Sequence, residues 1–109
     1  MIKKEVIKLL WIILCANVIY IPNLQAQEML IKGKVIYQED KTPVPYAYVQ
    51  IQGESVGTVT NYDGKFSLKI PIEFKNAQLV FSYVGFKQQH YTISKISNPD
   101  SMLIVMESD

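Results

Sequence analysis

The sequence predicts an all-β fold, a seven-stranded antiparallel β-sandwich preceded by a helical signal peptide. Three observations predict it. Apolar and polar residues alternate over short runs, turn-forming residues recur about every ten positions, and no helical period follows residue 26.

Residues 1–26 are predicted to be a secretory signal peptide, because three lysines precede an apolar run shorter than the roughly 20 residues of a membrane-spanning helix. Ala26 suits signal-peptidase cleavage, so residues 27–109 are the expected exported domain. Two alternatives stay open. One is an uncleaved membrane anchor, and the other is a lipoprotein attached through Cys15, against which the preceding bulky Leu14 argues.

The composition of residues 27–109 excludes several functions. They hold eight lysines and nine acidic residues, a net charge of −1, with no arginine and no cysteine. Bidentate recognition of phosphate by guanidinium groups is therefore absent, and the lysines are spread along the predicted strands, so nucleic acid is not an expected partner. Without a cysteine no disulfide can form, although the compartment of an exported protein would permit one. The stability of the domain must therefore come from a small apolar core.

The first predicted strand covers residues 29–38. Ile31, Gly33, Val35 and Tyr37 fall on one side of this period of two, and lysines fall on the other, as in a half-buried strand. A loop over residues 39–45 follows, because its two prolines lack the backbone donor that strand pairing requires.

The second predicted strand starts at Ala47 and ends before Gly53, with Val49 and Ile51 inward. Residues 56–60 and 65–70 then form two β-rich runs.

Between them, Asp63 and Gly64 predict the turn of a hairpin, because Gly accepts positive φ and Asp tolerates it while bonding its local backbone.

The next run, residues 77–86, is apolar on both faces and is expected to be a central strand, with a bend at Gly85. Residues 87–93 and 101–108 supply two further strands, separated by a turn at Asn98 and Pro99.

The stretch GTVTNYDGKFSL also invites comparison with a calcium loop. Aligned to the EF-hand pattern, Asn61, Asp63 and Gly64 take the third, fifth and sixth positions, but Val59 and Ile70 occupy the first and twelfth, where oxygen ligands are needed. No metal site and no cofactor are therefore expected, and the stretch is interpreted as a turn.

No catalytic residues are assigned. His90 is the single histidine, has no cysteine nearby to complete a zinc set, and is interpreted as a solvated surface residue. An acid–base pair of Asp63 with Glu54 or Asp40 is conceivable, but nothing in the sequence makes these carboxylates converge.

Six tyrosines lie in residues 27–109, and those at outward or loop positions could stack on sugars or anchor a protein partner. Packing and β propensity are the alternative reason for tyrosines in strands. Tyr46, Tyr48 and Tyr62 are the candidates for a contact surface.

Four motifs follow one another in order: G-x-V at Gly33 and Val35, a P-x-x-x-A-x-V-x-I-x-G segment starting at Pro43, the G-T-x-T-N-x-D-G-x-F stretch over 57–66, and L-V-F-S-Y-V-G-F over 79–86. Together they resemble the carboxypeptidase-regulatory-like domain, in the form found at the N-terminus of SusC/RagA-type TonB-dependent outer-membrane receptors. The resemblance covers residues 29–106 and implies a prealbumin-like sandwich and a non-catalytic accessory module. It supplies no site residues.

The sequence supports two alternative functions. The first is an exported, non-enzymatic module in the periplasm or at the outer membrane that binds another envelope protein, either as a stand-alone domain or as a truncated receptor N-terminus. The second is a small carbohydrate-binding module that uses exposed tyrosines. A hydrolase is disfavoured because the required constellation of residues is missing, and no transmembrane segment is expected after residue 26.

Overall fold

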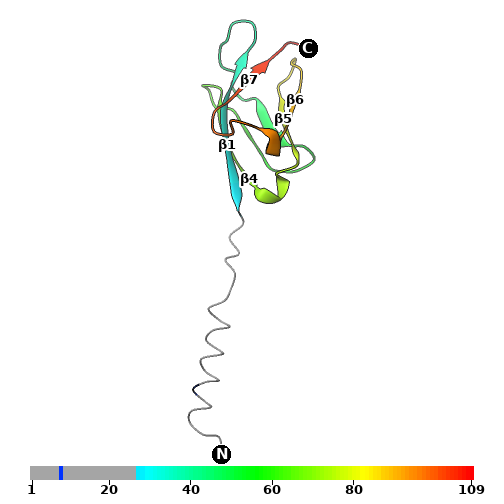
Figure 1. The fold of residues 1–109 in the computed structure, drawn as a ribbon. Helices are drawn as coiled ribbons and strands as arrows, with labels where there is room; N and C mark the ends of the chain where they lie inside the picture. Colours follow the sequence, from blue (N-terminus) through cyan, green and yellow to red (C-terminus); the bar gives the residue numbers. More distant parts are fainter. Residues whose placement is uncertain (1–7, 9–26) are drawn as a thin grey trace, which may run out of the picture.

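The computed structural model describes Lys8 and residues 27–109, so the predicted signal peptide lies outside the described residues except at Lys8. Seven strands and two 3₁₀ helices follow one another along the described chain (Figure 1). They are β1 (Glu28–Tyr37), β2 (Tyr48–Ile51), β3 (Gly57–Val59), β4 (Lys65–Pro71), η1 (Ile72–Phe74), β5 (Gln78–Ser82), β6 (Gln89–Thr92), η2 (Ile93–Lys95) and β7 (Met102–Met106).

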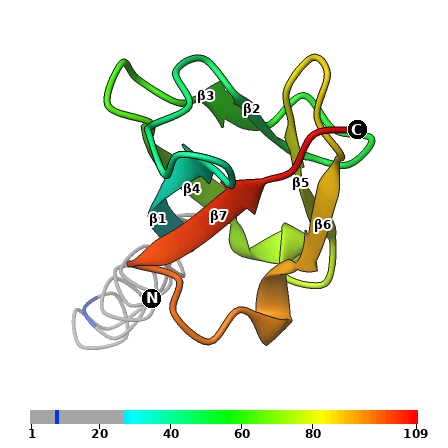
Figure 2. The same ribbon diagram turned by 90° about the horizontal axis from the view of Figure 1, so that it is seen from above.

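The strands form two sheets, which confirms the predicted sandwich. One sheet has the order β4-β1-β7 and the other the order β3-β2-β5-β6, and the view from above shows the two layers (Figure 2). The sandwich is not antiparallel throughout, because β1 and β7 pair in parallel while the other four strand pairs are antiparallel. Alternation of apolar and polar residues reports which face of a strand is buried, but not the direction of its neighbour.

The predicted hairpin between β3 and β4 is wrong. β3 pairs with β2 in the four-stranded sheet, and β4 pairs with β1 in the three-stranded sheet. The turn at 61–64 therefore carries the chain from one sheet to the other. Both β runs flank a tight turn in the sequence, and a corner between sheets leaves the same local signal as a hairpin.

The core fills the space between the sheets with the side chains that alternation placed inward. Ile31 and Val35 of β1, together with Val49 and Ile51 of β2, are completely buried. The other buried apolar residues are Val44, Ala47, Phe66, Leu68, Ile70, Leu79, Phe81, Ile93, Met102, Ile104 and Met106. The Phe66 and Phe81 rings meet edge to face across the two sheets at 5.3 Å between centroids, an arrangement that aromatic pairs favour.

β5 is a central strand, as expected, with β2 on one side and β6 on the other. Its inner residues Leu79 and Phe81 are fully buried, whereas Val80 on the outer face is only half-buried. The outer face is thus covered less completely than the apolar run suggested.

Candidate functional site

The stretch from Thr60 to Gly64 is a tight corner held by its own polar groups. The Asn61 side-chain oxygen accepts hydrogen bonds from the backbone N–H groups of Asp63, at 3.0 Å, and Lys65, at 2.9 Å. No hydrogen bond or ion pair within residues 27–109 involves the Asp63 carboxylate. Asn61 therefore performs the local bonding that was expected of Asp63, while Asp63 occupies the exposed tip of the turn.

Gly64 is required at this corner for two reasons. Its φ of 73° lies in the left-handed region, where a side chain is strained. A Cβ atom at Gly64 would also lie 2.6 Å from the carbonyl oxygen of Val35, whose own N–H donates to the Gly64 carbonyl at 2.8 Å. The corner thus docks its backbone directly on β1.

Thr60 is the single buried polar residue among those described, and it was not among the predicted site residues. Its hydroxyl donates to the Val44 carbonyl at 2.6 Å and accepts from the Ala47 N–H at 2.8 Å. These bonds connect the loop before β2 to the residue that follows β3. In the sequence, the polar pair Thr60 and Asn61 interrupts a β-rich stretch, and this interruption is the signal from which their bonding role could have been predicted.

Of the three carboxylates considered as catalytic groups, Asp40 holds its own loop, while Glu54 and Asp63 are exposed. The Asp40 carboxylate accepts hydrogen bonds from the Thr42 hydroxyl at 2.7 Å and the Thr42 N–H at 3.1 Å, which lower the pKa of Asp40. His90 lies on the exposed side of β6. Residues 27–109 contain no group of three or more His, Cys, Asp or Glu side chains placed to hold a metal ion.

The three candidate contact tyrosines are exposed. The exposed fractions are 63% for Tyr46, 58% for Tyr48 and 81% for Tyr62. Tyr48 lies directly opposite Val59 on the outer face of the β2–β3 pair, beside a shallow hollow of about 370 Å³. No ring-to-ring contact joins the three tyrosines in the described structure, so each presents a separate surface.

Tyr46 has a backbone that tyrosine rarely adopts. Its φ is 62°, and its N–H is held by the Thr60 carbonyl at 3.0 Å. A left-handed conformation costs a non-glycine residue roughly 1–2 kcal/mol. The exposed ring of Tyr46 is therefore held at a cost in stability.

We expect Tyr46→Gly to stabilise the domain by roughly 0.5–1 kcal/mol, because glycine removes the strain of the positive φ. The increase is measured by urea unfolding. Tyr62→Gly is the matched control, since Tyr62 has no positive φ, and it is expected to leave stability unchanged or lower it. Equal effects of the two changes would contradict the strain assigned to Tyr46.

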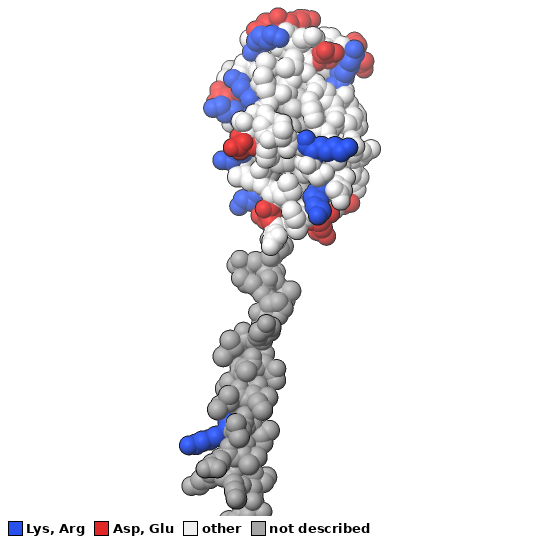
Figure 3. All heavy atoms as spheres, viewed as in Figure 1, with Lys and Arg blue, Asp and Glu red and all other residues white. Residues whose placement is uncertain are grey.

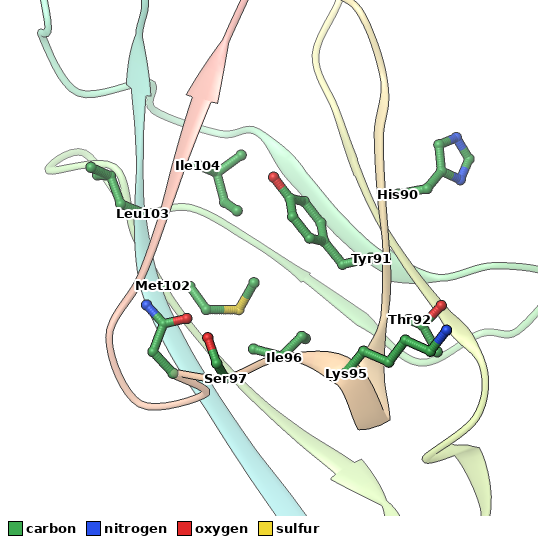
Figure 4. A pocket seen from close by; sticks show the side chains of 10 residues that line it. His90, Tyr91, Thr92, Lys95, Ile96, Ser97, Met102, Leu103 and Ile104 are labelled. Carbon is green, nitrogen blue, oxygen red and sulfur yellow. The ribbon is translucent and has the colours of Figure 1, made fainter.

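A pocket of about 400 Å³ lies between β6 and β7, where the edges of the two sheets face each other (Figure 4). Its lining includes Tyr91 and Thr92 of β6, Ile96 after η2, and Met102 and Ile104 of β7. Figure 4 shows Tyr91 and Ile104 pointing toward each other across this space, whereas His90 points away from it. We call this pocket the β6–β7 groove.

Tyr91 is anchored within the groove. Its hydroxyl donates to the Gln89 side-chain oxygen at 2.7 Å, and its ring packs edge to face on Phe81 at 5.6 Å. Burial raises the pKa of Tyr91 above its ordinary value of 10.0, because the phenolate would be poorly solvated there.

Stability is therefore expected to fall at alkaline pH. The contribution of Tyr91 is fully present below pH 10 and is lost as the pH rises through its raised pKa, since the unfolded chain ionises first. Urea unfolding at pH 8 and pH 11 measures the loss, and Tyr91→Phe should reduce it. An unchanged loss in Tyr91→Phe would assign the effect to other groups, such as Tyr37, whose pKa is also raised by burial.

Strand register brings several lysines onto the outer face of the three-stranded sheet. Lys34 of β1 lies directly opposite Lys65 of β4, and Lys32 and Lys69 face outward in the same two strands. The lysines are therefore closer together than their spread along the sequence suggested. In Figure 3, acidic side chains are interspersed with the basic ones on the visible face, so the charge there is mixed.

None of the helices in the described residues has the length and apolar character needed to cross a bilayer.

Comparison with known proteins places the described sandwich in context. The family model for the CarboxypepD_reg-like domain matches residues 31–109. A curated relative, TonB-dependent receptor P3 from Formosa agariphila, is 29% identical over 85 residues, which are 78% of this chain. The aligned segment spans 8% of the length of that receptor.

Proposed function

Because the chain belongs to the CarboxypepD_reg-like domain family, we propose that it is an exported, non-catalytic β-sandwich that binds another protein at the cell envelope. The family match carries this proposal, since it extends from the middle of β1 past the end of β7 and so includes both sheets. The likeness to a TonB-dependent receptor supports an envelope location.

The way the side chains are used also supports a binding role. The polar groups that are buried or locally bonded, such as Thr60, Asn61 and Asp40, serve to hold loops in place. What the molecule offers outward is strand edges, the β6–β7 groove and exposed tyrosines. Such features recognise partners through backbone pairing and apolar contact, without reaction chemistry.

Expression of the full chain with its own N-terminus, followed by cell fractionation and mild lysine cross-linking, tests this proposal. We expect the chain in the envelope fraction, in a discrete adduct with another envelope protein. Recovery as a free monomer, with no adduct at any cross-linker concentration, would refute the binding role.

A second candidate is carbohydrate binding by Tyr46, Tyr48 and Tyr62. The observation that favours it is their exposure, together with the hollow beside Tyr48, since sugar rings stack on exposed aromatic faces. Titration with a glycan panel tests it against a variant in which all three tyrosines are alanine. Saturable binding that the triple variant loses would favour this candidate over the first, and absence of saturable binding would remove it.

A further inference from the structure

We infer that the β6–β7 groove receives a single extended strand of another envelope protein, which adds to the sandwich by backbone hydrogen bonding. The inference rests on the proposed binding function and gives it a place and a chemistry.

One half of this side is already closed by backbone pairing. The Lys87 N–H donates to the Glu107 carbonyl at 2.9 Å, and the Asp109 N–H donates to the Gly85 carbonyl at 3.0 Å. At Gln89 the two segments separate, and the Gln89 side-chain amide bridges the fork to the Val105 carbonyl. Beyond this fork lies the β6–β7 groove, which ends at η2.

The backbone of β6 has unused groups on its groove side. The Ile93 N–H donates to the Ala77 carbonyl, so Ile93 directs its backbone groups toward β5. In an antiparallel ladder this direction alternates from one residue to the next. The N–H and C=O groups of Tyr91 therefore face β5, and those of His90 and Thr92 face away from it. No hydrogen bond within the described residues uses the outward N–H and C=O of His90 or the outward N–H of Thr92, whereas the Thr92 carbonyl caps the start of η2. β6 is therefore an open edge.

The facing strand has an open edge as well. Met106 directs its carbonyl toward β1, where it accepts the Gln38 N–H, whereas Val105 and Glu107 direct theirs to the opposite side. By the same alternation, the N–H and C=O groups of Leu103 face away from β1, and no partner for them occurs in residues 27–109. Two unpaired edges thus border one groove.

An extended polypeptide matches this arrangement better than other ligands do. It alone carries N–H and C=O groups that alternate at the spacing of a strand, and pairing with the four residues of β6 needs about 13 Å of chain, or about four residues. The groove floor is formed by Ile96, Met102 and Ile104, which favours an apolar side chain at the inward position of the incoming strand.

A second copy of this chain fits less well. The strands of a second copy are already paired with their neighbours, so such a copy would bring a whole sheet to the groove. The groove is closed at both ends, by the Gln89 fork and by η2, and suits a strand without neighbours. The other edges are also less suited, since β3 has three residues and β4 carries two lysines and ends at Pro71, features that discourage strand addition. The occupant we infer is a lone strand from a partner.

The test uses a displayed library of random heptapeptides, selected against the chain recovered after export, and then the enriched peptides in solution. His90→Pro removes an outward donor without touching the β5 ladder, and proline is tolerated at such edge positions. We expect it to weaken peptide binding at least tenfold. Lys69→Pro, which removes an outward donor on the edge of β4, is the matched control and should change binding less than twofold.

A second arm leaves the protein unchanged. Each enriched peptide is made in two N-methylated forms, one methylated on the odd-numbered backbone amides and the other on the even-numbered ones. The form whose methyl groups block pairing with β6 should bind at least tenfold more weakly than the other form. The amide signals of His90, Thr92 and Leu103 should shift on binding. Equal affinities of the two forms, shifts confined to other strands, or a library that yields no binder would overturn the inference. A concentration-dependent dimer that shifts the same amides would replace the partner strand with a second copy.

The two proposals fail separately. If the chain is cross-linked to an envelope protein but binds no peptide in the groove, the strand-addition inference is wrong and the proposed function stands. If peptides bind the groove and no envelope protein is captured, the envelope role is wrong.

Discussion

Replacing Gly64 with valine is expected to destabilise the domain by roughly 4 kcal/mol, a large part of the total stability of a domain of about 80 residues. Two effects add. A β-branched residue resists the φ of 73°, and its Cβ would press on the Val35 carbonyl 2.6 Å away. Because the Gly64 backbone docks on β1, the strain is borne by a central strand and cannot be relieved at the surface.

Gly53→Val separates the two effects. Gly53 also has a positive φ, of 78°, but a Cβ atom there would meet nothing within 4 Å. It should therefore cost only the roughly 1–2 kcal/mol of a left-handed residue. Urea unfolding of both variants measures the difference, and similar losses for the two glycines would show that close approach to Val35 contributes nothing.

The second large effect is expected at Thr60. Thr60→Val keeps the shape of the side chain but leaves the Val44 carbonyl and the Ala47 N–H without the partners they now have at 2.6 and 2.8 Å. Each buried polar group without a partner costs about 1–3 kcal/mol, so we expect a loss of about 3 kcal/mol and a fall in Tm of about 15 °C.

Two neighbouring changes act as controls for Thr60. Thr60→Ser keeps the hydroxyl and should lose about 1 kcal/mol, which corresponds to one buried methyl group. Thr58→Val lies two residues earlier in β3, where the threonine is only half-buried and has no assigned side-chain hydrogen bond, and it should be nearly neutral. Comparable losses from Thr58→Val and Thr60→Val would contradict the role given to the buried hydroxyl.

Alternation along the chain predicted the inward residues well, because burial of one face of a strand leaves a local period of two. Val49 and Ile51 were predicted to face inward, and both are completely buried. The direction of β7 and the sheet that receives β3 were beyond this signal, since they depend on pairing between residues far apart in the sequence.

The functional features divide in the same way. Tyr48 is exposed because it alternates along β2 with the inward-facing Val49 and Ile51, and this alternation can be read from the sequence. The bonds of Thr60 reach 13 and 16 residues back along the chain, so no local pattern contains them. The β6–β7 groove arises where two strand edges diverge after Gln89, a property of the assembled sheets and not of either strand.

Site-specific photo-cross-linking in growing cells tests the binding role most directly. A photoreactive residue replaces either Thr92, on the groove side of β6, or Lys69, on the far edge of β4. We expect one discrete adduct with an envelope protein from position 92 and none from position 69, with the linked residue in an extended segment of the partner. Adducts of equal yield from both positions, or from neither, would contradict it.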